Sequence, residues 1–286
     1  MTHTAHLFRV CGGAVRQLPG RLRSGNMSEK LRGNILVTGA NRGIGLELVR
    51  QLAQSIGENA HIYACCREIE GPRAQALKNL STPGKITLVK LDLSDEGSIS
   101  SAVQAVSRNM EAGGLNLLIN NAAINRPESP APLSATGKQH MMDVYETNVV
   151  GPFLLVKMLL PLLQKAAEMD SEGDQMSCSR SAIVNISTLI SSIEKCPESF
   201  HIAQMYPYRT SKAALNMLTR CHAEEFKRHN ILVTAVHPGW VRTEMGGEKA
   251  PLTPEDSVAG MLSVMLSLSN KHSGMLLDWQ GNTIPW

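Results

Sequence analysis

The amino-acid sequence predicts an α/β fold in which a single doubly wound parallel sheet of about seven strands is flanked by helices. The first observation is a regular alternation, from residue 34 onward, of short apolar runs with longer segments of helical periodicity. The second is that the apolar runs are nearly continuous, as is typical of strands buried on both faces. Strands that alternate with helices in this way form a parallel sheet covered on both sides.

The expected elements follow one another along the chain. Strands are expected at 34–38, 61–66, 85–91, 115–120, 181–187, 231–237 and 274–279. Helices are expected at 44–56, 70–80, 95–111, 138–168, 209–229 and 254–268. Two connections depart from this rhythm. The Pro- and Ser-rich segment 125–137 is predicted to be a surface loop. The segment 189–207 is longer than usual, and with the region after Thr243 it is expected to form the substrate pocket.

Charge is distributed unevenly between the first 30 residues and the rest of the chain. The net charge is +3, but residues 1–30 hold five Arg or Lys residues and a single acidic one, Glu29. This segment resembles a mitochondrial transit peptide or a dispensable leader that precedes a start at Met27. We therefore exclude residues 1–30 from the fold and expect one domain over 31–286. Its near-neutral charge does not favour nucleic-acid binding.

Three further classes of protein are disfavoured by the sequence. The best candidate for a membrane span begins at Val149 and is interrupted by Pro152, Lys157 and Pro161, so no span is expected. None of the six cysteines forms a C-x-x-C pair, which favours buried free thiols in a reducing compartment. The nine histidines lack ligand spacing, so no metal is expected. The expected location is cytoplasmic, or mitochondrial if residues 1–26 act as a transit peptide.

The first strand leads directly into TGANRGIG, residues 38–45, and then into a helix. Glycines in such a turn allow a tight bend, close approach of the backbone to a phosphate, and close packing of helix on strand. The helix N-terminus offers unpaired N–H groups and a positive dipole end to a pyrophosphate. Because the turn begins a βαβ series, it predicts a Rossmann-type dinucleotide site. The residues assigned to this site are Gly39, Asn41, Arg42, Gly43, Ile44 and Gly45.

The end of the second strand indicates which dinucleotide binds. An NAD site usually has an acidic residue here, but this chain has Cys65, Cys66 and Arg67. A carboxylate would repel a 2′-phosphate, whereas a guanidinium binds one with two parallel hydrogen bonds. Arg42 in the glycine-rich turn could reach the same phosphate. The sequence therefore favours NADP(H) as the cofactor.

The third and fourth strands are also followed by candidate cofactor residues. Asp92, in the motif KLDLSD, could accept a hydrogen bond from the adenine amino group or cap the helix that follows Ser94. The motif NNAA, residues 120–123, has small residues that let the backbone pass close to a cofactor. Its asparagine amides can tie neighbouring strands together. Leu93, Asn121 and Ala122 join Asp92 as candidate cofactor-binding residues.

The sixth strand is followed by PGWVRT, residues 238–243. Pro238 and Gly239 are expected to turn the chain beneath a nicotinamide. Thr243 could bond the carboxamide of that ring or the pyrophosphate. These residues, with Val241, complete the expected cofactor site.

A proline disturbs the long helix expected at 138–168. Pro152 follows Asn148 by four residues, so the carbonyl of residue 148 loses its helical N–H partner. The sequence leaves open whether the resulting kink is incidental or whether the freed carbonyl faces a cleft and holds a water molecule.

The stretch YPYRTSK, residues 206–212, contains a candidate proton-handling pair. Tyr208 and Lys212 are four residues apart and would lie on one helix face, whereas Tyr206 has Thr210 at that spacing. A nearby ammonium favours the phenolate and is expected to lower the pKa of Tyr208. Such a phenol can donate a proton to a carbonyl oxygen or remove one from an alcohol. Pro207 is expected to let the helix begin at about Tyr208.

Together these motifs resemble the classical short-chain dehydrogenase/reductase family over essentially all of 34–286. The matching motifs are TGANRGIG, LDLSD, NNAA, Asn148, the strand end NIST, YRTSK and PGWVRT. Within that family, YRTSKAALN, PGWVRTEMGG and the ending DWQGNTIPW are most similar to the carbonyl reductases related to the insect protein sniffer and bacterial C-factor.

The resemblance implies a catalytic tetrad and a reaction. Asn148, Tyr208 and Lys212 match it directly, and the hydroxyl position corresponds to Thr188, with Ser187 as the alternative. The implied function is NADPH-dependent reduction of a ketone, aldehyde or quinone to an alcohol, with Tyr208 as general acid. Alternatives are an alcohol or hydroxysteroid dehydrogenase working oxidatively, and a cofactor-binding signalling protein with incidental catalysis. Helices 138–168 and 209–229 often pair subunits in this family, so a homodimer is expected.

Overall fold

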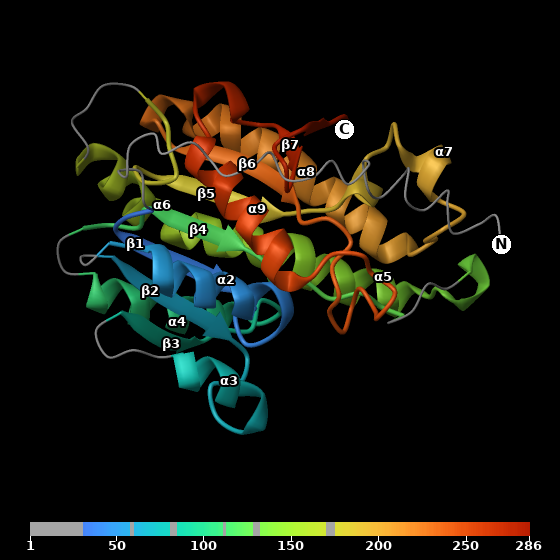
Figure 1. Ribbon diagram of the computed structural model, residues 1–286, viewed down its shortest axis with the longest axis horizontal. Coiled ribbons are helices and arrows are strands. Elements are labelled where there is room, and N and C mark those ends of the chain that lie inside the picture. Colours follow the sequence, from blue (N-terminus) through green and yellow to red (C-terminus); the bar gives the residue numbers. More distant parts are fainter. Residues whose placement is uncertain (1–30, 58–59, 81–84, 111–112, 128–131, 170–174) are drawn as a thin grey trace.

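The computed structural model describes residues 31–286 except 58–59, 81–84, 111–112, 128–131 and 170–174, so the expected leader 1–30 lies outside the described residues. One eight-stranded sheet forms the centre of the molecule (Figure 1), in the order β3-β2-β1-β4-β5-β6-β7-β8. The strands are β1 Asn34–Thr38, β2 His61–Cys66, β3 Ile86–Lys90, β4 Leu117–Asn120, β5 Ala182–Ile186, β6 Leu232–His237, β7 Leu276–Asp278 and β8 Thr283–Ile284.

The predicted fold class is confirmed, and one strand was missed. Strands β1 to β7 are parallel, while β8 pairs antiparallel with β7 at the edge of the sheet. The side chain of Asp278 accepts hydrogen bonds from the backbone N–H groups of Gln280 and Asn282 and so turns the chain back after β7. A strand of two residues has too little apolar pattern to be recognised in the sequence.

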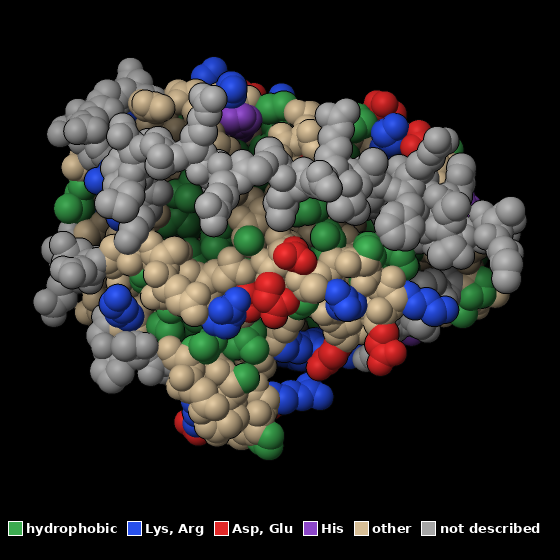
Figure 2. Space-filling view, in the orientation of Figure 1, with side chains coloured by type: hydrophobic (Ala, Val, Ile, Leu, Met, Phe, Trp, Pro, Cys, Tyr) green, Lys and Arg blue, Asp and Glu red, His purple; other side chains and the backbone are tan. Residues whose placement is uncertain are grey.

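Helices cover both faces of the sheet, as the nearly continuous apolar runs predict. Side chains of α2 and α9 pack into the core on one face, and those of α4, α6 and α8 pack on the other (Figure 1). The helices are α2 Gly43–Ser55, α3 Pro72–Leu80, α4 Glu96–Asn109, α5 Lys138–Tyr145, α6 Gly151–Met169, α7 Cys196–Ser199, α8 Tyr206–Phe226 and α9 Pro254–Ser267. Basic and acidic side chains lie interspersed on the face drawn in Figure 2.

The long helix expected at 138–168 contains the predicted disturbance. A π-helical turn, η2 (Glu146–Val150), joins α5 to α6, and the N–H of Gly151 donates to the carbonyl of Glu146. Within the part of the chain that the structure describes, the stretch Lys138–Met169 is the one helix long and apolar enough to cross a membrane. Its buried side, which includes Leu155 and Leu159, packs against the sheet like the core helix of a globular domain.

The exposed sides of α6 and α8 carry large apolar side chains. Phe153 on α6 and Met217 on α8 are exposed, and the ring of Phe153 stacks on that of His222 at a centroid distance of 6.2 Å. The expected homodimer stays a prediction. The expectation of buried thiols is wrong for Cys221, which is exposed on α8, and Cys196 is only half-buried. Cys65, Cys66 and Cys178 are buried.

Candidate active site

A deep recess lies at the carboxyl ends of the central strands. Its volume is about 870 Å³, and it extends from α3 past the glycine-rich turn to Tyr208 and Lys212. Strands β1 and β4 are neighbours here although they are far apart in the chain order, so the recess opens where the sheet changes winding direction. Ligands bind at this point in open α/β sheets.

The glycine-rich turn has the geometry that a dinucleotide needs. Gly39 and Gly43 have φ of 66° and 51°, in the region that favours glycine. A Cβ added at Gly45 would lie 2.1 Å from the carbonyl oxygen of Gly39. Helix α2 begins at Gly43, and the side chain of Arg42, the residue directly before it, does not cap its first N–H groups. Turn and helix start thus form a cradle that fits a pyrophosphate.

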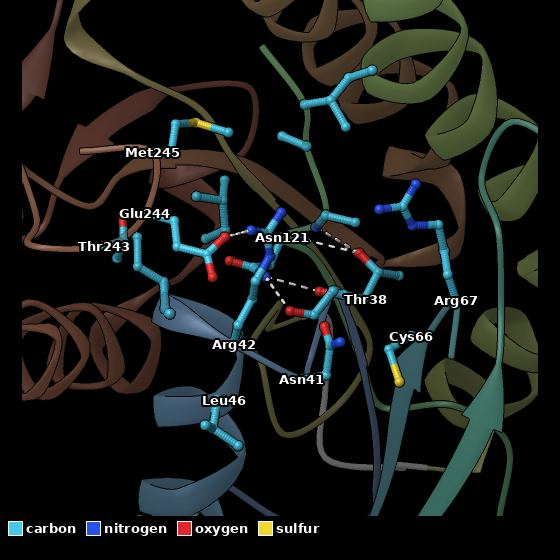
Figure 3. A pocket seen from close by; sticks show the side chains of 18 of the residues that line it. Thr38, Asn41, Arg42, Leu46, Cys66, Arg67, Asn121, Thr243, Glu244 and Met245 are labelled. Atoms are coloured by element: carbon cyan, nitrogen blue, oxygen red, sulfur yellow. Dashed lines mark hydrogen bonds and ion pairs between the residues drawn. The ribbon is translucent and has the colours of Figure 1, made fainter. Parts of the chain in front are cut away.

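Asn121 and Thr38 hold the two strands on either side of this cradle (Figure 3). The side-chain amide of Asn121 donates to the carbonyls of Thr38, at 2.9 Å, and Gly39, at 3.2 Å. The hydroxyl of Thr38 accepts from the backbone N–H groups of Asn121 and Ala122, both at 3.0 Å. The predicted tie between neighbouring strands is therefore present, and it fixes the turn against β4.

Several arginine side chains line the α3 end of the recess, where the 2′-phosphate of NADP(H) is expected to bind. Arg42 and Arg67 both line it, and Arg73 on α3 adds a third guanidinium that the sequence analysis did not identify. The spacing of Arg73, Ala76 and Leu80, which places them on one face of α3, is the signal that could have found it. Arg42 also forms an ion pair with Glu244, which crosses the recess from the segment after β6 (Figure 3).

Asp92 lines the recess, but the suggestion that it caps the following helix is wrong. Its carboxylate accepts from the N–H and the hydroxyl of Ser94. The cap of α4 is Asp95, which accepts from the N–H groups of Gly97 and Ser98. Asp95 stands directly before the helix, which is the position a capping side chain needs. The adenine contact of Asp92 stays a prediction.

The segment after β6 contributes Pro238, Thr243 and Met245 to the recess, and the methyl of Thr243 lies against Gly43. Gly239 and Val241 are not among the residues that line it. A Cβ on Gly239 would lie 2.3 Å from a methyl of Leu252, so this glycine permits close packing behind the recess. Leu93, Asn41 and Ile44 do line it, as expected.

Helix α8 brings Tyr208 and Lys212 to the far end of the recess. The helix begins at Tyr206, two residues earlier than expected, because Met205 adopts a left-handed φ of 33° and Pro207 occupies the first turn. The Lys212 ammonium is almost fully buried, donates to the carbonyl of Ile186 at 2.6 Å, and lies 5.8 Å from the centre of the Tyr208 ring. The two side chains therefore share one site, as their spacing predicts.

The pKa of Tyr208 is raised, whereas the sequence predicted that it would be lowered. Burial raises the pKa of Tyr208 to about 12 and lowers the pKa of Lys212 to about 7. Removal from water disfavours both charged forms, and this outweighs the attraction between an ammonium and a phenolate. Tyr208 is thus held as a neutral proton donor at physiological pH.

The two candidate hydroxyls have different surroundings. Ser187 lines the recess, but its hydroxyl donates to the side-chain oxygen of Asn216 at 2.6 Å. Thr188 is not among the lining residues; it is 9% exposed, and its hydroxyl makes no hydrogen bond within the described residues. The hydroxyl that is free to donate therefore belongs to Thr188.

Asn148 is fully buried, and its side chain is committed to structure. The amide oxygen accepts from the N–H of Ile124, and the amide nitrogen donates to the carbonyl of Ile124 and to the hydroxyl of Ser211. It thus joins the chain after β4 to α8. Its main-chain carbonyl lies in the π-helical turn, and the water that it is expected to hold stays a prediction.

The segment 189–207 does not line the recess, contrary to expectation. It folds into a short 3₁₀ turn and α7 and is drawn toward the start of α8 by Arg209, which is buried. The guanidinium donates to the carbonyls of Ala203, at 2.6 Å, Ser199, at 2.7 Å, and Ile190, at 3.1 Å. Ile124 and Met245 line the recess instead, and Met245 belongs to the region after Thr243, as predicted.

Fold and site together define a dinucleotide-binding α/β protein with a tyrosine and a lysine beside the cofactor cradle. Within the described ranges, no group of three or more His, Cys, Asp or Glu side chains could hold a metal ion. Residues 33–252 match the family model of the short chain dehydrogenases, and the chain belongs to this family.

Individual relatives agree with the predicted subgroup. The structure of an NADPH-bound carbonyl reductase from chicken fatty liver is 42% identical, with a TM-score of 0.84 and coverage of 90% of this chain and 96% of the other. The carbonyl reductase Sniffer of D. melanogaster is 33% identical, with a TM-score of 0.82 and coverage of 89% and 100%. C-signal of Myxococcus xanthus is 30% identical over 64% of this chain and 100% of its own length.

Proposed function

We propose that the protein is an NADPH-dependent carbonyl reductase that converts a ketone, aldehyde or quinone into an alcohol. The observation that carries this proposal is that Tyr208 and Lys212 line the same recess as the glycine-rich turn and the arginines. The similarity to carbonyl reductases, one of them bound to NADPH, supports both the reaction and the cofactor. The expected partner is a small carbonyl compound.

Each residue of the site has a distinct part in this reaction. The nicotinamide, when bound, supplies the hydride that reduces the carbonyl carbon. Tyr208 donates its phenolic proton to the carbonyl oxygen, where negative charge develops. The Thr188 hydroxyl donates a second hydrogen bond to that oxygen and orients the substrate.

Lys212 and Asn148 support the tyrosine. With a pKa of about 7, Lys212 can hold or release a proton near neutral pH and can return one toward the phenolate that Tyr208 becomes. Its ammonium also stabilises that phenolate by charge. The main-chain carbonyl of Asn148 is proposed to hold a water molecule that links the site to bulk solvent.

The direct test follows the loss of NADPH absorbance with a panel of ketones, aldehydes and quinones. Carbonyl-dependent oxidation of NADPH is the expected result. Faster oxidation of alcohols with NADP⁺ at neutral pH would favour an alcohol or hydroxysteroid dehydrogenase. Tight NADPH binding without turnover of any compound would favour a signalling role.

Arg67 is expected to determine the preference for NADPH over NADH. Arg67→Ala should raise the Kd for NADPH by about 10- to 100-fold, because a hydrogen bond to a charged group contributes about 1.5–3 kcal/mol. The Kd for NADH, which has no 2′-phosphate, should change less than about twofold. Quenching of protein fluorescence measures both values, and Arg67→Lys, which keeps the charge but not the paired geometry, should give an intermediate loss. Equal losses for both cofactors would contradict the assignment.

A further inference from the structure

A stripe of polar side chains runs along the face of α8 that packs on the sheet, in a position where apolar residues are the norm. The stripe consists of Lys212, Asn216 and Thr219, all of them buried. Each member forms a hydrogen bond with a different residue at or just after the end of β5. The ammonium of Lys212 donates to the carbonyl of Ile186, and the hydroxyl of Thr219 accepts from the side-chain amide of Asn185 at 2.9 Å. The stripe therefore sets the register of α8 against the end of β5.

Asn216 is the member of the stripe that bonds to residues on both sides of Thr188 in the chain. Its amide oxygen accepts from the Ser187 hydroxyl at 2.6 Å, and its amide nitrogen donates to the Ser191 hydroxyl at 2.8 Å. Ser191 in turn donates to the carbonyl of Thr188 at 2.5 Å. Three side chains thus form one chain of hydrogen bonds in which every hydroxyl proton is used.

This network leaves little freedom to the residue it surrounds. Ser187, Ser191 and Asn216 are 2%, 3% and 4% exposed, so water cannot replace a lost partner without entering the core. The backbone on one side of Thr188 is fixed as well, because the N–H of Ser187 donates to the carbonyl of Val236 at 2.8 Å. The Thr188 side chain itself takes no part in the network and keeps its hydroxyl available.

We infer that Asn216 is a positioning residue that acts through Thr188. It holds the strand end so that the Thr188 hydroxyl and the Tyr208 phenol, which belong to different elements, converge on one carbonyl oxygen. The inference rests on the proposed function, because that function supplies the shared oxygen. It also assigns Ser187 to the positioning network, since its proton is already donated.

The test is a double-mutant cycle in kcat with Asn216→Ala, Thr188→Ala and both together. Thr188→Ala should lower kcat about 100-fold, the scale for loss of one donor to a developing oxyanion. Asn216→Ala should lower it roughly tenfold through misplacement of that donor. If Asn216 acts through Thr188, the double variant should match Thr188→Ala within about twofold. The Kd for NADPH should stay within about twofold in all three.

Thr219→Val is the matched control on the same stripe. It removes a buried hydrogen bond to Asn185 but leaves the network around Thr188 intact. We expect it to lower the denaturation midpoint as Asn216→Ala does, while kcat stays within about twofold of the wild type. If Asn216→Ala does not fold, Ser191→Ala is the substitute, because it removes the bond to the Thr188 carbonyl and the acceptor of the Asn216 amide nitrogen. It keeps the bond between Ser187 and Asn216 and should give the same pattern with a smaller loss.

Several outcomes would overturn the inference. Multiplicative losses of kcat in the double variant would show that Asn216 acts independently of Thr188. The same conclusion would follow if Asn216→Ala lowered kcat while Thr188→Ala remained fully active. In the second case an inactive Tyr208→Phe would leave the proposed function standing. If the wild type reduces no carbonyl, the proposed function fails. Denaturation of Ser187→Ala, Asn216→Ala and the variant that carries both changes then tests the network by itself. Additive shifts of the denaturation midpoint would contradict a shared network.

Discussion

Tyr208→Phe is expected to lower kcat for carbonyl reduction by about a thousandfold while the Kd for NADPH stays nearly unchanged. Burial raises the pKa of Tyr208 to about 12, so the phenol stays a neutral donor at physiological pH. General acid catalysis by a positioned side chain contributes typically about 10²- to 10⁴-fold. Removing one oxygen atom keeps the ring and its packing, so the loss should fall on turnover. Steady-state kinetics with NADPH and the best compound of the panel measures it.

Tyr206→Phe provides a control that removes the same atom two residues away. Tyr206 is the first residue of α8, and its ring packs edge-on against that of Phe200 at a centroid distance of 5.5 Å. Its hydroxyl contributes nothing to the lining of the recess among the described residues. The kcat of this variant should lie within about twofold of the wild type. Wild-type turnover by Tyr208→Phe, or an equal loss in both variants, would remove Tyr208 from its proposed role.

Local sequence pattern was sufficient to predict the frame of this site. The strands before the glycine-rich turn and before NNAA are short apolar runs with abrupt polar ends, so their boundaries could be placed closely. Gly39 and Gly45 have no other role that explains their spacing before a helix. The four-residue interval from Tyr208 to Lys212 gives one helix face directly, because side chains at that spacing lie above one another. These features depend on residues near each other in the chain.

The missed features depend on partners that no regular spacing in the sequence indicates. Glu244 pairs with Arg42 across the recess, and Arg209 holds the carbonyls of a segment that precedes it, but neither partner is indicated by spacing. The pKa of Tyr208 has the opposite direction from the one expected because burial, not the nearest charge, dominates it. Asn216 could have been placed on the same face of α8, since it follows Lys212 by four residues, but its partners Ser187 and Ser191 lie in the segment after β5.

Lys212→Met is expected to stabilise the cofactor-free protein at pH 6 and to lose that advantage by about pH 10. Burial lowers the pKa of Lys212 from 10.5 to about 7, so the folded state disfavours the charged form. Below pH 7 this penalty is fully present, at roughly 5 kcal/mol if one pKa unit corresponds to about 1.4 kcal/mol. It fades as the pH rises from 7 to 10.5, because the unfolded chain then loses the proton too. Wild-type stability should therefore rise across this window.

The methionine removes the penalty but also removes the donor to the carbonyl of Ile186, which costs about 1–3 kcal/mol. We therefore expect a net gain in unfolding free energy on the order of 2 kcal/mol at pH 6, and a value at or below the wild type near pH 10. Urea denaturation at several pH values would reveal the crossover. Lys157→Met, which replaces an exposed lysine on α6, should show no such crossover. If Lys212→Met is more stable than the wild type but inactive, the buried lysine destabilises the fold and is needed for the reaction. Destabilisation at pH 6 would mean that its hydrogen bond outweighs its burial.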